Sequence, residues 1–166
     1  MTWSMFRTII ILPGMVVIFI PTAILWVTAD TTFAGELLKP GRMAFWLSLV
    51  PAVFGLLFAV WTVLLFRKFG KGTPAPWDPP KKLVVRGPYR HVRNPMITSV
   101  LLMLITESLV FQSWFLAVWT LVFFVGNLLY FPIVEEKGLE RRFGEDYRVY
   151  KANVPRWVPR PRPWSG

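Results

Sequence analysis

Three long stretches of this chain are almost without charge. No charged residue occurs in residues 8–29 or 43–66, and Glu107 is the only one in residues 94–134. A helix needs about 20 apolar residues to cross the roughly 30 Å hydrocarbon core of a bilayer. Each of the first two stretches therefore predicts one membrane-spanning helix, whereas the third is about twice too long for a single span.

Polar residues gather near the middle of the third stretch, between Glu107 and Ser113. A helical hairpin that turns between Glu107 and Trp114 keeps the backbone hydrogen bonds inside helices and the charge near an interface. The sequence therefore predicts an all-α, polytopic membrane protein that forms a single membrane domain over residues 1–166. The predicted spans cover about residues 8–29, 43–66, 94–110 and 113–134, with a loop at 67–93 and a tail at 135–166.

The cationic residues are distributed unevenly between these spans. Eight Lys and Arg lie in residues 67–93 and eight more in residues 135–166, whereas residues 30–42 hold two cations and two acids. By the positive-inside rule, the basic loop and both termini are cytoplasmic. The net charge of +10 then reflects topology and attraction to anionic membrane lipids, worth about 1 kcal/mol per residue, and we expect no nucleic-acid surface. The expected location is a bacterial inner (cell) membrane.

The tail begins with an amphipathic pattern. Leu139, Phe143, Tyr147 and Tyr150 recur at helical spacing with charged residues between them, which predicts a cytoplasmic helix over residues 135–150. Gly144 interrupts this pattern without forbidding the helix. The chain has no cysteine and no cluster of residues at metal-ligand spacing, so we expect neither thiol chemistry nor a metal site.

A basic turn directly precedes the third span. Gly87 starts a turn that contains several cations, and Pro95 is suited to the first turn of the following helix. Cations beside a helix N-terminus at a membrane surface form an anion-binding corner, with a basic interfacial anchor as the alternative interpretation. His91, the only histidine, is a candidate general base, or else a loop residue without a catalytic role.

Two adjacent carboxylates, Glu135 and Glu136, follow the fourth span. They gain nothing from the dipole at the C-terminal end of a helix. A cationic partner would explain them, either a protein arginine or a positively charged group of a ligand. A solvated helix end is the alternative.

Two motifs, in order and separated by the predicted hairpin, resemble a known superfamily. Residues 83–95 read LVVRGPYRHVRNP, and residues 135–156 read EEKGLERRFGEDYRVYKANVPR. Together they resemble the isoprenylcysteine carboxyl methyltransferases and phospholipid methyltransferases, which are integral membrane methyltransferases. The resemblance covers about residues 83–159.

The resemblance implies S-adenosylmethionine as methyl donor, bound at the cytoplasmic face between the two motifs, with a lipophilic or small-molecule methyl acceptor. The adenosine end of the cofactor is expected to lie against residues 81–84 and Tyr89. For an amine acceptor, which must be deprotonated, His91 and Glu136 are the candidate catalytic bases. The expected cofactor-binding residues are Lys82, Leu83, Val84, Gly87, Tyr89, Arg93, Asn94, Pro95, Glu135 and Glu136.

Three positions depart from the family pattern. Asn94 replaces a histidine, Ile97 replaces an aromatic residue, and Phe131 stands where the carboxyl methyltransferases have an arginine. The loss of that arginine favours an amine, a phospholipid head group or a thiol over a carboxylate acceptor. Two other functions remain open: an NADPH-dependent enzyme similar to the much larger sterol reductases, and a catalytically inactive membrane partner subunit.

Overall fold

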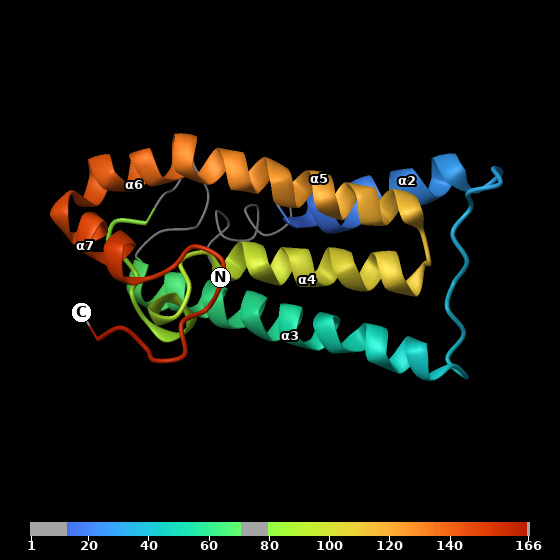
Figure 1. Cartoon of the computed structure of the whole chain (residues 1–166), viewed down its shortest axis with the longest axis horizontal. Helices are drawn as coiled ribbons and strands as arrows, with labels where there is room; N and C mark the ends of the chain where they lie inside the picture. Colours follow the sequence, from blue (N-terminus) through green and yellow to red (C-terminus); the bar gives the residue numbers. More distant parts are fainter. Residues whose placement is uncertain (1–12, 71–79, 166) are drawn as a thin grey trace. The chain divides into compact units, whose positions relative to one another are not determined.

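The computed structural model describes residues 13–70 and 80–165 of the chain (Figure 1). Within these residues the secondary structure is helical without strands, which confirms the all-α prediction. Parts of the predicted first span and of the loop at 67–93 lie outside the described residues. The elements are the π-helical turns η1 (Met15–Phe19), η2 (Phe66–Gly70) and η4 (Phe131–Glu135), the 3-10 turn η3 (Gly87–Arg90), and the helices α2 (Ile20–Thr28), α3 (Met43–Leu65), α4 (Pro95–Val110), α5 (Trp114–Tyr130), α6 (Glu136–Phe143) and α7 (Glu145–Asn153).

Two of the described helices are long and apolar enough to cross a membrane. They run over Met43–Gly70 and Trp114–Phe143, with 28 and 30 residues. The apolar helices Met15–Thr28 and Pro95–Val110 are shorter. At 1.5 Å per residue the 16 residues of α4 rise about 24 Å, less than the roughly 30 Å hydrocarbon core. The arrangement of four spans therefore stays a prediction.

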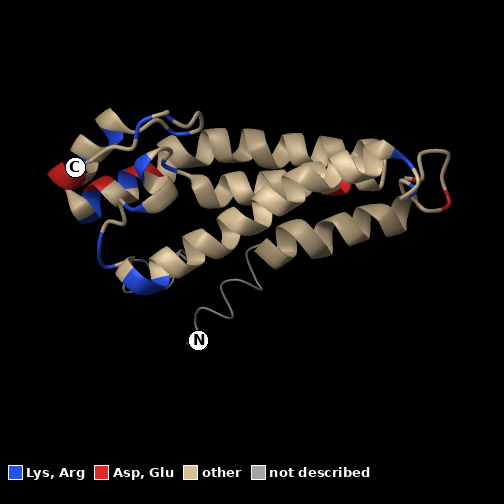
Figure 2. Cartoon of the chain, turned by 90° about the horizontal axis from the view of Figure 1, so that it is seen from below, with Lys and Arg blue, Asp and Glu red and all other residues tan. Residues whose placement is uncertain are grey.

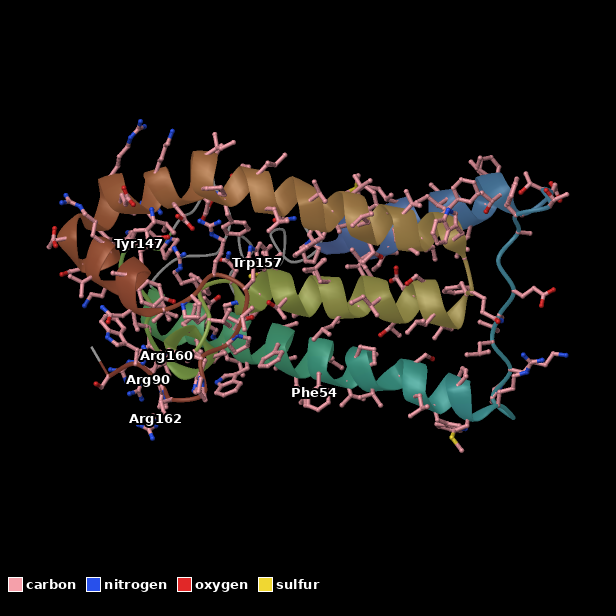
Figure 3. The ribbon with its side chains drawn as sticks, in the orientation of Figure 1. Phe54, Arg90, Tyr147, Trp157, Arg160 and Arg162 are labelled. Carbon is pink, nitrogen blue, oxygen red and sulfur yellow. The ribbon has the colours of Figure 1, made fainter. Side chains whose placement is uncertain are left out.

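The chain falls into two compact units, Met1–Leu57 with Ser99–Val125 (unit 1) and Phe58–Thr98 with Gly126–Gly166 (unit 2). That the whole chain forms one domain stays a prediction. In unit 1 the chain reverses between α4 and α5, where Gln112 has a φ of 44°. The backbone N–H of Leu38 donates to the carbonyl of Val110 over 2.7 Å, so the loop before α3 is fastened to this turn. Large apolar side chains of unit 1 are exposed, as in a lipid environment, and Phe54 points away from the neighbouring helices of its unit (Figure 3).

Unit 2 contains the end of α3, the loop that leads to α4, the end of α5, and everything that follows. The predicted amphipathic helix over residues 135–150 is divided in the structure. Its first part, α6, continues directly from α5 as one helix over Trp114–Phe143. Gly144 then has a φ of +56°, a backbone conformation that ends a helix and is easiest for glycine, and α7 starts in a new direction (Figure 1).

The packed core of unit 2 lies on one side of α7. Tyr147, Tyr150 and Val154 are buried at exposed fractions of 3%, 3% and 1%, and the first two belong to the predicted helical pattern. Figure 2 shows the Lys and Arg of unit 2 over α6, α7 and the segment that follows them. The side chains packed against this core include Leu83, Val85, Leu139, Phe143 and Trp164.

Candidate functional site

A cavity of about 150 Å³ lies within unit 2. The loop before α4 supplies one part of its wall and the first turn of α4 another, while the far wall comes from η4, α6 and α7. The two motifs of the sequence thus meet around one space. It is lined by Phe66, Pro80, Lys82, Leu83, Val84, Tyr89, Arg93, Asn94, Met96, Ile97, Phe131, Glu135, Leu139, Phe143, Tyr147 and Tyr150.

Most of the predicted cofactor-binding residues lie on this wall. Seven of the ten do so, namely Lys82, Leu83, Val84, Tyr89, Arg93, Asn94 and Glu135. Gly87, Pro95 and Glu136 are not among the lining residues, and neither is His91. The roles of all these residues in binding and catalysis remain predictions. The structure does bring the seven lining residues together around one cavity.

Glu136 is a buried carboxylate that contacts three cations. Its Oε1 accepts hydrogen bonds from Arg93 Nη1 at 2.9 Å and from Arg156 Nε at 2.6 Å. Lys151 Nζ lies 3.1 Å from Oε2 and also contacts Glu140 at 2.7 Å. The Glu136 side chain is only 4% exposed. Protein cations therefore supply the partner that the sequence requires for this carboxylate, and a carboxylate held by three cations is a weak proton acceptor.

Glu135 differs from its neighbour. It is half-buried and lines the cavity. No salt bridge among the described residues involves it. On the same wall, Arg93 Nε is buried and has no hydrogen-bond partner within the described part of the chain. The cavity wall thus carries one carboxylate outside the salt bridges of the described residues, beside an arginine whose buried Nε–H is unsatisfied.

The tyrosines of the site are held as neutral phenols. Tyr150 donates its hydroxyl hydrogen to the backbone carbonyl of Tyr89 at 2.8 Å. Burial raises the pKa of Tyr89 well above its ordinary value of 10.0, and the neighbouring Tyr150 raises it further. Burial is also the main cause of the raised pKa of Tyr150. Both side chains therefore offer ring faces and hydrogen bonds at neutral pH rather than a phenolate base.

Gly87 starts a turn, as predicted, and it also packs against α3, a contact that no local sequence pattern indicates. Its φ is +56°, and an added Cβ would lie 3.0 Å from Leu65 Cδ1 and 3.0 Å from Trp61 Cζ2. Glycine at this position therefore lets the turn pack against the end of α3 without backbone strain or crowding. This packing positions Tyr89, whose ring meets that of Phe66 edge-on with centroids 5.5 Å apart.

The segment after α7 fastens the basic turn, and we call residues 154–164 the tail strap. The Arg93 N–H donates to the Pro155 carbonyl at 2.9 Å. His91 Nδ1 lies 2.8 Å from the Arg160 carbonyl oxygen, and because a carbonyl only accepts, this nitrogen carries the hydrogen. The His91 side chain therefore anchors the strap. The Trp164 ring packs on Tyr150 with centroids 5.7 Å apart, a contact that no local sequence pattern indicates.

Comparison with known proteins agrees with this arrangement. The family model for phospholipid methyltransferase matches residues 43–146, which is more than half of the chain. It includes the first motif and the beginning of the second. Comparison with the curated proteins and with the solved structures gives no match. The chain therefore belongs to the phospholipid methyltransferase family, among the integral membrane methyltransferases that its two motifs resemble.

Proposed function

We propose that the protein transfers a methyl group from S-adenosylmethionine to a lipophilic or small membrane-accessible acceptor. An amine, a phospholipid head group or a thiol is favoured over a carboxylate. The observation that carries this proposal is the cavity of unit 2, where both motifs meet around Glu135 and Arg93. The family match to a membrane methyltransferase supports the reaction class.

The residues of the cavity fit the chemical groups of this cofactor. Its ammonium or ribose hydroxyls suit the Glu135 carboxylate, and its carboxylate suits the positive charge of Arg93. The apolar wall near Leu83 and Val84 suits the adenine ring. A volume of about 150 Å³ is below the roughly 300–1,000 Å³ of usual ligand pockets, so the cavity encloses one moiety of the cofactor. When bound, S-adenosylmethionine supplies an electrophilic methyl group on a sulfonium.

The chain's own task in this proposal is to bind, to align and to exclude water. Met96, Ile97 and Phe131 give part of the cavity an uncharged wall. Phe131 is held edge-on by Trp157, with ring centroids 5.8 Å apart. Burial of a carboxylate against such a wall is costly without a cationic partner, which supports an acceptor without a carboxylate.

An amine acceptor would also have to lose a proton, for which a base is needed. His91 and Glu136 are the predicted bases, but neither lines the cavity, and each is already engaged with protein groups. Glu135 is the carboxylate that does line it. In this proposal His91 and Glu136 act as positioning residues, and Glu135 is the group closest to a bound ligand.

The orientation in the membrane belongs to the proposal as well. The positive-inside rule places the two basic segments, and with them the cavity, on the cytoplasmic side. The cofactor would then enter from the cytoplasm and a lipophilic acceptor from the bilayer. The bacterial inner membrane stays a prediction.

The test is a titration of the purified full chain in detergent with S-adenosylhomocysteine and, separately, with NADPH. We expect binding of the first only. Glu135→Ala should weaken this binding at least tenfold, and Glu145→Ala, which removes an exposed carboxylate of α7, should not. Binding of NADPH alone would favour a reductase, and binding of neither compound would favour an inactive partner subunit.

A further inference from the structure

The tail strap brings three arginines to one surface of unit 2. The Arg160 N–H donates to the His91 carbonyl at 3.0 Å, and the Trp164 N–H donates to the Arg90 carbonyl at 3.0 Å. The strap therefore crosses the basic turn at two points, and Arg162 lies between them in the chain. Figure 3 shows Arg90, Arg160 and Arg162 gathered where the strap crosses the turn.

These arginines retain unused hydrogen-bond donors. Arg90 Nε donates to the Trp164 carbonyl at 2.5 Å, and Arg160 Nη1 donates to the Asn153 carbonyl at 2.8 Å. A guanidinium has five N–H donors, so most donors of both side chains bond to no residue in the described part of the chain. Arg162 is exposed, and its side chain makes no hydrogen bond with a described residue.

The charge of this group is also uncompensated. None of the salt bridges among the described residues includes any of the three arginines. This contrasts with the ions around Glu136, where a carboxylate accompanies the cations. Three arginines on one surface give it a positive potential, and a bound anion would be attracted to it.

The surroundings select the kind of anion. Val158, two residues before Arg160, is 75% exposed. An apolar side chain beside cations is typical of a surface that meets the head groups of a bilayer. In a membrane protein, the phosphates at highest local concentration are those of lipids. An anionic head group has no cation of its own to compete with the arginines.

We propose that Arg90, Arg160 and Arg162 bind the phosphate of an anionic membrane phospholipid, at a site separate from the cavity. Guanidinium groups match phosphate with paired hydrogen bonds. The bound lipid holds the strap against the basic turn. Because the strap also contacts Arg93 and Tyr150, binding of the lipid stabilises unit 2.

The experiment uses the full chain in detergent with added phosphatidylglycerol, phosphatidylcholine or inorganic phosphate. Native mass spectrometry measures lipid retention, and a thermal unfolding scan measures stability. We expect phosphatidylglycerol to be retained and to raise the unfolding temperature more than phosphatidylcholine does. The double variant Arg160→Gln/Arg162→Gln should retain at least tenfold less phosphatidylglycerol.

The matched control is Arg141→Gln/Arg148→Gln, which removes the same charge from α6 and α7. Equal loss of phosphatidylglycerol in the control would overturn the proposal, because the lipid would then respond to net charge alone. Inorganic phosphate that displaces phosphatidylglycerol at equal concentration would also overturn it. Arg162→Gln alone guards against misfolding, since this exposed side chain makes no hydrogen bond with a described residue, and it should lower retention measurably.

Binding of S-adenosylhomocysteine is measured in parallel. Loss of lipid retention with normal cofactor affinity would separate this site from the cavity. The lipid site does not rest on the proposed methyl transfer, so the failure of one proposal leaves the other standing.

Discussion

The interactions inside unit 1 differ in kind from those inside unit 2. Every salt bridge among the described residues lies in unit 2. In unit 1, hydroxyl groups bond to the backbone of their own helix, as Thr28 does to Ile24 at 2.8 Å and Ser48 to Phe45 at 2.6 Å. Removal of a charge should therefore lower the stability of unit 2 far more than that of unit 1. Unit 1 should instead be sensitive to added side-chain bulk.

The largest effect is expected from Glu136→Ala in unit 2. The substitution leaves three cations around a vacated site, and Arg93, whose side chain is 10% exposed, loses its carboxylate. Removal of one member of a buried ion pair typically costs about 3–5 kcal/mol. We expect a large fall in the unfolding temperature of the purified protein, together with loss of S-adenosylhomocysteine binding.

Glu136→Gln sharpens this prediction, because it keeps the shape of the side chain and removes only its charge. It should recover little of the lost stability. Full recovery with glutamine would mean that packing rather than charge holds the cluster, and the contrast between the two units would fail.

The next largest effect is expected at a glycine of the same unit. Gly87→Ala imposes a Cβ on a φ of +56° and places it 3.0 Å from two side chains of α3. Backbone strain of this kind costs about 1–3 kcal/mol, and crowding against α3 adds to it. A thermal unfolding scan of Gly87→Ala should therefore show a clear fall in the unfolding temperature, and an unchanged unfolding temperature would contradict the packing role of Gly87.

Unit 1 should respond to size. An added Cβ at Gly55 would lie 3.0 Å from the Ser99 carbonyl oxygen and 3.2 Å from Leu102 Cβ, so α3 and α4 approach closely there, as helices do at small residues in membranes. Gly55→Leu should cost about 1–3 kcal/mol through overpacking, measured as a lower unfolding temperature. Gly126→Leu is the control, because nothing lies within 4 Å of an added Cβ at Gly126. Equal damage in both variants would show that bulk alone, and not the contact with α4, is responsible.

The two units also differ in how well the sequence predicts them. The charge-free stretches predict the long helices closely, since α3 covers Met43–Leu65 against a predicted 43–66. Bilayer thickness acts on each stretch by itself, so a local pattern is sufficient. The convergence of the two motifs followed from the resemblance, and the cavity brings together seven of the ten predicted cofactor-binding residues.

The finer features of unit 2 depend on contacts between distant segments. Glu135 and Glu136 are adjacent and chemically identical, and only the positions of Arg93 and Arg156 decide which of them is paired. The local sequence of the tail strap shows only that it is rich in proline. Its contacts could not be predicted because the partners lie far earlier in the chain, as His91 and Arg160 do with a separation of 69 residues. The helix break at Gly144 has a local signal, but glycine alone does not fix its φ.

The smallest effect is expected from an exposed ion pair of unit 2. Arg148 and Glu145 lie 3.0 Å apart on α7, with side chains 65% and 72% exposed. Water screens such a pair, which contributes about 0–1 kcal/mol. Glu145→Ala should therefore change the unfolding temperature little, and added salt should remove even that difference. A loss as large as that of Glu136→Ala would show that charge anywhere in unit 2 is critical. We expect instead that the burial of Glu136, whose side chain is 4% exposed, makes its charge critical.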